Sequence, residues 1–226
     1  MAGKGDIAII GFGSLIWELD DLAPRVVGNW MLGAGPSLPL EFTRVSRKRH
    51  GALTVVIDHD HGAPCTTHVI RSRRDSLLRA VVDLALRERA SPAQIGYAAA
   101  RPDSEAEAEQ IIRETTEVAA DWPDIHPGPA QAASPEIAAR VRDWCRDNGW
   151  RGAVWTDLPS NYTEKTGESF AIQGAEHYLA GLTGAAATGA VRYITEAPAA
   201  TDTPLRRHLA TRAWWQTSVD ALSRAG

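Results

Sequence analysis

The 226-residue chain has little of several features that mark specialised classes of protein. Its only cysteines, Cys65 and Cys145, are too few for a disulfide framework or a cysteine-based zinc site. No apolar run approaches the roughly eighteen residues that a membrane helix needs. No basic stretch precedes an apolar one near the start, so we expect neither a membrane span nor a secretion signal.

The chain also lacks an excess of basic residues. It has 24 Lys and Arg against 28 Asp and Glu, which gives a formal net charge of −4. Nucleic-acid binders usually carry a basic surplus, so this class is disfavoured. With 44% hydrophobic residues and eight tryptophans, the chain can bury a real core. We therefore expect a cytoplasmic α/β protein with one domain over residues 1–226, in which residues 100–226 add mostly helices.

Strand-like segments dominate the first half of the sequence. A buried-strand pattern over residues 6–10 stops at Gly11-Phe12-Gly13. Three further runs, at residues 38–46, 53–58 and 65–71, are joined by short polar turns and favour an antiparallel meander.

Helical patterns dominate the rest of the chain. An amphipathic pattern predicts a helix over residues 75–89, with Asp75 as its N-cap. Pro135 at a first helical position and the pair Asn148-Gly149 bound another helix. The remaining expectations are strands at 95–98 and 153–155, helices at 104–120, 169–182 and 203–223, and a surface loop at 122–133.

The most informative stretch is Gly11-Phe12-Gly13-Ser14-Leu15-Ile16-Trp17, directly after the first strand. Two glycines permit a tight turn whose backbone N–H groups converge on an anion, and Ser14 adds a hydroxyl. The stretch is neither a Walker loop nor a dinucleotide fingerprint, because the residues that complete those motifs are missing. An ordinary strand-ending turn remains the alternative.

This stretch resembles the Gly-Tyr-Gly-Ser-Leu-Ile-Trp signature that opens γ-glutamylcyclotransferase-like proteins, especially the ChaC branch. The resemblance implies that Phe12, Gly13, Ser14 and Leu15 hold the γ-glutamyl group of a small-molecule substrate. It also implies a mixed α/β fold with a partly closed, antiparallel-rich β-barrel and flanking helices. The likeness covers residues 6–98, with a weaker match at Phe42, Ser46, Arg49 and Gly51.

The catalytic glutamate of that family matches Glu88, in Leu86-Arg87-Glu88-Arg89 followed by Gly96-Tyr97. The implied reaction closes 5-oxoproline within the substrate and expels an amine, with Glu88 as general acid and base and no metal or other cofactor. Phe12 stands where the family usually has tyrosine, and the surroundings of Glu88 differ from the glutathione-degrading pattern. A non-catalytic binder of an anion or small molecule on the same fold is the alternative, with Glu88 a solvated helix-end charge.

Other residues leave alternatives open. Glu41, in an apolar strand, either faces the same cavity as a rival base or lies on the surface. The run Asp58-His59-Asp60-His61 suggests a metal site or, preferably, a polar turn. Segment 155–162 forms either a second wall of the pocket or a capped loop.

The remaining candidates are basic, aromatic and thiol side chains. Cys145 is expected to be a packed thiol. Trp214 and Trp215 are either core anchors or an oligomer contact, which leaves a homodimer open. Two basic clusters could contact phosphate or nucleic acid, protect strand edges, or supply an arginine for a substrate carboxylate. Their members are Arg44, Arg47, Lys48 and Arg49, and Arg71, Arg73 and Arg74.

Overall fold

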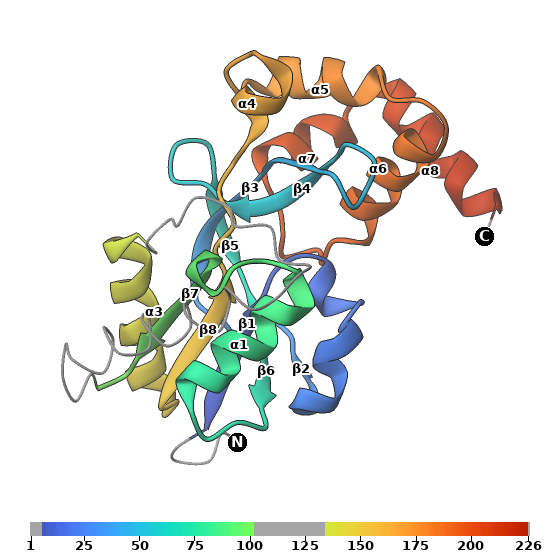
Figure 1. The fold of residues 1–226 in the computed structure, drawn as a ribbon. Helices are drawn as coiled ribbons and strands as arrows, with labels where there is room; N and C mark the ends of the chain where they lie inside the picture. The colour runs from blue at the N-terminus through green and yellow to red at the C-terminus, as the bar shows by residue number, and fades with distance from the viewer. Residues whose placement is uncertain (1–5, 102–133, 226) are drawn as a thin grey trace. The chain divides into compact units, whose positions relative to one another are not determined.

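The computed structural model describes residues 6–101 and 134–225, which form two compact units (Figure 1). The first unit holds described residues 6–11, 15–36, 66–101 and 134–158. The second holds residues 12–14, 37–65 and 159–225. The helix expected at 104–120 and the loop expected at 122–133 lie outside the described residues.

The first unit is built on a five-stranded mixed sheet in the order β2-β6-β1-β8-β7. Its strands are β1 (Ile7–Gly11), β2 (Val26–Met31), β6 (His68–Ser72), β7 (Ile95–Ala99) and β8 (Gly152–Thr156). The central strand β1 runs antiparallel to β6 and parallel to β8. Every residue of β1 is buried, as expected for a strand that is covered on both faces.

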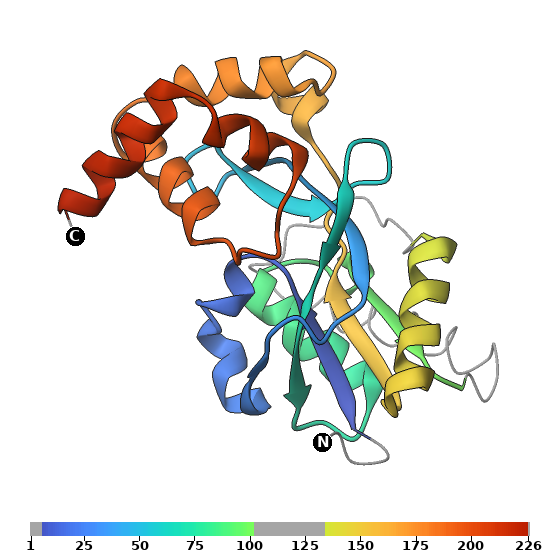
Figure 2. The ribbon, with the colours of Figure 1, turned by 180° about the vertical axis from the view of Figure 1, so that it is seen from behind.

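Helix α1 (Leu77–Glu88) covers the face of this sheet that carries Ile7, Ile9 and Val154. Figure 1 shows α1 in front of the strands, and the view from behind in Figure 2 shows the strands in front of α1. Valines, leucines and alanines at helical spacing form its buried side. The packing of α1 on this face places its last residue, Glu88, beside the sheet.

The predicted bounds of α1 and of the next helix need one correction. The N-cap of α1 is Ser76 and not Asp75, because the Ser76 carbonyl accepts the first helical hydrogen bond, from the N–H of Ala80 at 3.1 Å. Helix α3 (Pro135–Asn148), which packs along β7 and β8, begins at its proline and ends before Gly149 (φ 76°), as predicted.

The second unit combines a three-stranded sheet with helices. Its central strand β3 (Ser37–Ser46) lies between β4 (Ala52–Ile57), to which it is antiparallel, and β5 (Ala63–Thr66). Helix α6 packs on β4, α7 packs on β3, and α8 packs on α6. The helices are α4 (Tyr162–Thr166), α5 (Ile172–Ala180), α6 (Gly184–Glu196), α7 (Pro204–Ala210) and α8 (Ala213–Ala225).

The predicted antiparallel meander is wrong in its third strand. The run at 65–71 divides into β5 and β6, which belong to different sheets. The break falls at Thr67, whose N–H and hydroxyl both donate to the carbonyl of Pro36, while its own carbonyl accepts from Gly35. These bonds to residues 35 and 36 take the place of strand pairing at Thr67, and the chain passes from one sheet to the other there.

Several elements differ from the sequence expectations, and composition explains two of them. Strand β2 contains Gly28 and Asn29, which disfavour strand predictions, and α6 begins with a run of glycine, alanine and threonine. The helix expected at 203–223 is two helices, α7 and α8, separated at Thr211 and Arg212.

The mixed α/β class predicted from the sequence is confirmed. Among residues 6–101 and 134–225, the strands make two sheets and no closed barrel. The described helices also include none that is both long and apolar enough to cross a membrane.

Candidate active site at the end of helix α1

Glu88 is the last residue of α1, and its side chain is largely buried, with 15% of its surface exposed. Its Oε1 accepts a hydrogen bond from Arg87 Nη1 at 2.6 Å and one from Thr156 Oγ1 at 3.3 Å. Both of these bonds end on Oε1, and Oε2 has no partner among the residues that the structure describes. The side chain is therefore more buried and better paired than a fully solvated helix-end charge would be, and one carboxylate oxygen remains for another group.

Arg87 holds this carboxylate in place. Its side chain is only 4% exposed, and its Nη2 donates to the backbone carbonyl of Glu18. A guanidinium anchored to a backbone oxygen fixes the orientation of the carboxylate that it pairs with. It also offsets the unfavourable position of Glu88 at the negative end of a helix.

Thr156 places Glu88 at the carboxyl edge of two parallel strands. Strand β1 lies beside β8 with Ile10 opposite Trp155, so the same register brings Gly11 opposite Thr156. On the other side of β1, His68 of β6 is opposite Gly11. Residues paired across neighbouring strands point to one face, so Thr156 and His68 share the face that α1 covers.

The glycine loop begins at this edge. A Cβ on Gly11 would lie 2.6 Å from Trp30 Cη2 and 2.7 Å from Ile16 Cδ1, so only glycine fits. Leu15 is buried in the core of the first unit. The loop is thus held at both ends by first-unit residues, and its continuation is the short 3-10 turn Ser14–Ile16.

The middle of the loop, residues 12–14, belongs to the second unit. The carbonyl of Phe12 accepts a hydrogen bond from Thr201 Oγ1 at 3.0 Å. A Cβ on Gly13 would lie 2.8 Å from Tyr193 Oη and 2.9 Å from Val55 Cγ1. Neither Gly11 nor Gly13 has a left-handed φ. Close packing, and not a left-handed turn, explains both glycines.

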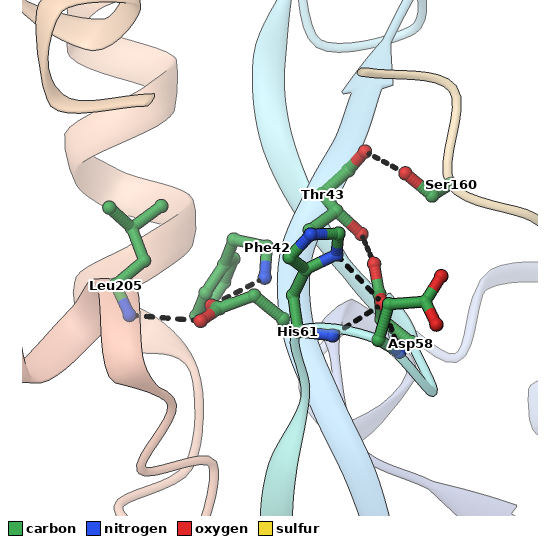
Figure 3. Close-up of polar contacts among 8 residues, drawn as sticks. Phe42, Thr43, Asp58, His61, Ser160 and Leu205 are labelled. Carbon is green, nitrogen blue, oxygen red and sulfur yellow. Dashed lines mark hydrogen bonds and ion pairs between the residues drawn. The ribbon is translucent and has the colours of Figure 1, made fainter. Parts of the chain in front are cut away.

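Glu41, the rival base, has a structural role. It is fully buried in β3, so the surface alternative is wrong. Its Oε2 accepts from the N–H of Leu205 in the first turn of α7 at 3.0 Å, and its Oε1 accepts from its neighbour Phe42 at 2.8 Å (Figure 3). Burial raises the pKa of Glu41, against the lowering effect of these bonds and of the Thr203 hydroxyl.

The run at 58–61 folds as a polar turn. Asp58 accepts hydrogen bonds from the N–H groups of Asp60 and His61 and from Thr43 Oγ1, the last at 2.7 Å (Figure 3). Burial opposes ionisation of Asp58, but these bonds and the His61 imidazole lower its pKa overall. The turn also brings ligand atoms of Asp58, Asp60 and His61 within 4.8 Å, closer than a strand would allow. The Asp58 oxygens already serve the turn.

Segment 155–162 serves both units in different ways. In the first unit it supplies Thr156, the contact of Glu88. In the second, Asn161 bonds both the N–H and the carbonyl of Val45, and Ser160 Oγ donates to the carbonyl of Thr43 at 2.9 Å. Its polar side chains thus extend the edge of β3, as a capped loop would.

The basic residues have local partners. In the first unit, Arg71 pairs with Asp6 and Arg74 forms a two-bond pair with the buried Asp83. In the second unit, Arg44 Nη1 donates to the Pro159 carbonyl, and Arg49 lies 4.7 Å above the ring of Tyr193. These contacts favour structural roles for the basic clusters.

The cysteines and the tryptophan pair pack as expected. Both thiols are free and buried, and burial raises the pKa of Cys145 to about 12. Trp215 is buried, and the Trp214 indole N–H donates to Glu176 Oε1 at 2.9 Å. The core alternative for Trp215 is confirmed.

We compared the chain with protein-family models, curated proteins and solved structures. No family model, curated protein or solved structure matches this chain. The likeness to γ-glutamylcyclotransferase-like proteins therefore rests on the sequence alone, over residues 6–98.

Sequence reasoning named Thr156 only as part of segment 155–162, without its contact to Glu88, and did not single out His68. Thr156 lies in a segment rich in hydrogen-bonding groups after a predicted strand, which was a usable signal. His68 begins β6 with a polar, ionisable ring before the apolar pair Val69 and Ile70. A histidine at this position is visible in the sequence. Its place beside Gly11 is not, because it depends on a strand pairing between residues far apart in the chain.

Proposed function

We propose that this protein is a γ-glutamylcyclotransferase-like enzyme. It would cleave a γ-glutamyl amide or amine by intramolecular cyclisation to 5-oxoproline, with Glu88 as general acid and base and without a cofactor. The partly closed barrel typical of such proteins is part of this proposal. The leaving amine stays unassigned.

The observation that carries the proposal is the environment of Glu88. Its carboxylate is oriented by buried Arg87 and by Thr156, while Oε2 stays unbonded among the described residues. A general base needs a fixed carboxylate with one oxygen open to the substrate. A carboxylate that served only to join α1 to β8 would be expected to use both oxygens.

The chain itself keeps the loop near this edge. Gly11 is opposite Thr156, and Ser14 follows Gly11 by three residues, which span at most about 11 Å. Leu15, the next residue, is anchored in the first-unit core. We propose that the backbone N–H groups of Gly13, Ser14 and Leu15, aided by the Ser14 hydroxyl, hold the γ-glutamyl group.

The proposed reaction is balanced with one catalytic carboxylate. Glu88 takes a proton from the α-ammonium of the substrate, and the free amine attacks the γ-carbonyl carbon. The resulting oxyanion is stabilised by the loop N–H groups. The C–N bond to the leaving amine then breaks as that amine takes the proton from Glu88, and the second proton of the ring nitrogen passes through the same carboxylate to the leaving amine, which departs as its ammonium. This releases neutral-ring 5-oxoproline and restores the Glu88 carboxylate.

The test is release of 5-oxoproline from γ-glutamyl amino acids, γ-glutamyl amines and glutathione by the wild type and by Glu88→Gln. Loss of a general base costs typically 10²–10⁴-fold, so we expect the variant to lose that much of kcat. Since both bonds to Glu88 end on Oε1, the glutamine oxygen can keep them and the fold should persist.

Glu41→Gln is the matched control, because Glu41 is a buried glutamate whose bonds serve the fold. Its activity per folded molecule should stay close to that of the wild type. Equal activity in the wild type and Glu88→Gln would move the catalytic role elsewhere. Absence of release from every substrate would favour the alternative, a non-catalytic binder, and a ligand titration would then decide it.

A further inference from the structure

The carbonyl of Phe12, in the glycine loop, is held by a residue far along the chain. Thr201 Oγ1 donates a hydrogen bond to it at 3.0 Å, although the two residues are 189 positions apart. Both residues are buried, Thr201 completely, and both belong to the second unit. The peptide between Phe12 and Gly13 is therefore tied to the second unit by a bond that solvent does not reach.

This bond also sets the direction of the next N–H group. The Phe12–Gly13 peptide is trans and planar, so the carbonyl of Phe12 and the N–H of Gly13 point in opposite directions. Because Thr201 holds the carbonyl, the Gly13 N–H points away from Thr201. Among the residues that the structure describes, none accepts a hydrogen bond from this N–H. Its direction is thus fixed from the carbonyl side of the peptide.

Ser14 is the partly exposed member of residues 12–14, whereas Phe12 and Gly13 are buried. Gly13 has so little room that a Cβ would lie 2.8 Å from Tyr193 Oη, which also belongs to the second unit. The Thr201 bond before Gly13 and this close contact at Gly13 leave the backbone little freedom. Ser14 is therefore presented from a fixed backbone.

Thr201 is itself braced by an arginine. Arg206 Nη1 donates to the carbonyls of Pro198 at 2.6 Å and Thr201 at 3.1 Å, and its Nη2 donates to that of Ala197 at 2.8 Å. The N–H of Thr201 also donates to the Pro198 carbonyl at 2.8 Å. A planar guanidinium that bonds several carbonyls at once holds their segment in one geometry. The hydroxyl of Thr201 therefore meets the Phe12 carbonyl from a braced segment.

Oriented N–H groups stabilise a developing oxyanion because they need no reorganisation at the moment of reaction. We infer that Thr201 is a positioning residue: its hydroxyl orients the Phe12–Gly13 peptide and, through it, the N–H groups of Gly13 and Ser14 that hold the γ-glutamyl group. This assignment rests on the proposed function. Thr201 acts through the loop and does not touch the substrate. Loss of its hydroxyl should therefore lower kcat more than it raises KM.

Thr201→Val tests the hydroxyl, because valine has the shape of threonine without the donor. We expect kcat to fall roughly 10- to 100-fold, since a misplacement of about 1 Å can cost about 100-fold. KM should change less than kcat. Thr201→Ser, which restores the hydroxyl, should recover most of the activity.

Thr43→Val is the matched control. Thr43 is also fully buried in the second unit, and its hydroxyl donates to a different acceptor, Asp58 Oδ2, at 2.7 Å. Both valine variants should lose stability, because each leaves a buried oxygen without its donor. Only Thr201→Val should lose kcat per folded molecule.

A measurement on the free protein reads the loop without turnover. The amide signal of Gly13, followed by NMR, should shift in Thr201→Val, return in Thr201→Ser and stay in place in Thr43→Val. A signal that Thr201→Val leaves unchanged would mean that the hydroxyl does not orient this peptide. That result overturns the inference whether or not a substrate is turned over.

The kinetic outcomes separate this inference from the proposed function. If Thr201→Val keeps the kcat of the wild type while Glu88→Gln loses it, the proposed reaction stands, Thr201 is only structural, and the inference is wrong. If the wild type releases 5-oxoproline from no substrate, the proposed function fails and the inference fails with it.

Discussion

The two units differ in how their buried polar groups are satisfied. In the second unit, the buried carboxylates of Glu41 and Asp58 accept hydrogen bonds from backbone N–H groups and a threonine hydroxyl. In the first unit, buried N–H groups of Trp30, His68, Arg87, Arg142 and Trp155 have no acceptor among the described residues. No buried side-chain nitrogen or oxygen in the described part of the second unit is left in that state.

This difference shows in which unit the burial of polar side chains is offset by hydrogen bonds among the described residues. An unpaired buried donor costs about 1–3 kcal/mol, which folding alone would not favour. The hydrogen bonds of Asp58 more than offset the cost of its burial, and those of Glu41 offset a part of it.

The largest expected effect is a contrast between two glutamates: substitution of Glu41 should lower stability, and substitution of Glu88 should lower activity. Glu41→Gln should lower the free energy of unfolding by about 2–3 kcal/mol, because its amide NH₂ must face the N–H of Phe42 or of Leu205. Glu88→Gln should change it by less than about 1 kcal/mol while losing activity. Urea unfolding followed by tryptophan fluorescence measures both.

An equal stability loss in the two variants would break the comparison. It would mean that Glu88 serves the fold as Glu41 does. Asp60→Asn controls for the loss of a charge. Asp60 is exposed, and its hydrogen bond to Asp58 is made by its backbone N–H, which the substitution leaves in place.

Cysteine labelling can assign such a loss to one unit. Cys65 lies in the second unit and Cys145 in the first, and burial raises the pKa of both thiols. Neither should react with a disulfide reagent until its surroundings open. A destabilisation of about 2 kcal/mol by Glu41→Gln should speed labelling of Cys65 roughly thirtyfold.

The rate at Cys145 is the internal reference for this experiment. If the labelling rate of Cys145 rises by the same factor as that of Cys65, the two units open together. The difference in their buried polar groups then has no counterpart in separate stabilities of the units. Single-cysteine variants, Cys65→Ala and Cys145→Ala, identify which thiol has reacted.

The packing around Gly13 gives a somewhat smaller effect. Gly13→Ala places a methyl group 2.8 Å from Tyr193 Oη and 2.9 Å from Val55 Cγ1, so we expect a loss of about 1–2 kcal/mol. Gly189→Ala, in α6, meets nothing within 4 Å and should stabilise by about 0.5–1 kcal/mol. Thermal unfolding compares the two, and equal shifts would contradict the close packing.

Local signals in the sequence predicted much of the fold. Residues 6–10 and the proline and glycine at the ends of α3 act within a few positions, and the structure confirms the elements that they predict. The division at Thr67 depends on residues 35 and 36, which are about thirty positions away. Patterns within a short window carry no information about such pairings.

The site divides in the same way. The glycine motif and Glu88 are visible in the sequence, whereas the difference between Glu88 and Glu41 is not. Both are glutamates in partly apolar segments, and only the tertiary contacts show that Glu41 bonds the start of α7. Thr201 likewise gains its proposed role from its bond to Phe12, which depends on what lies around it in space.

The smallest expected effect is the dependence of stability on pH. His208 comes first among the groups that hold Glu176 in the second unit, followed by the Trp214 indole and Arg212, and together they lower its pKa from 4.5 to about 2. The folded state then binds fewer protons than the unfolded chain between these values. Its stabilisation is complete above about pH 4.5 and is lost as the pH falls toward 2.

Glu176→Gln should therefore flatten the fall in stability over this pH range and leave the profile above pH 5 parallel to that of the wild type. Glu41 acts with the opposite sign, because its pKa is raised and its protonation removes the cost of a buried charge. Unfolding in urea at a series of pH values, for both variants, separates the two contributions. An unchanged acid limb in Glu176→Gln would mean that the exposed parts of its network are screened, and that the second unit owes its acid sensitivity to Asp58.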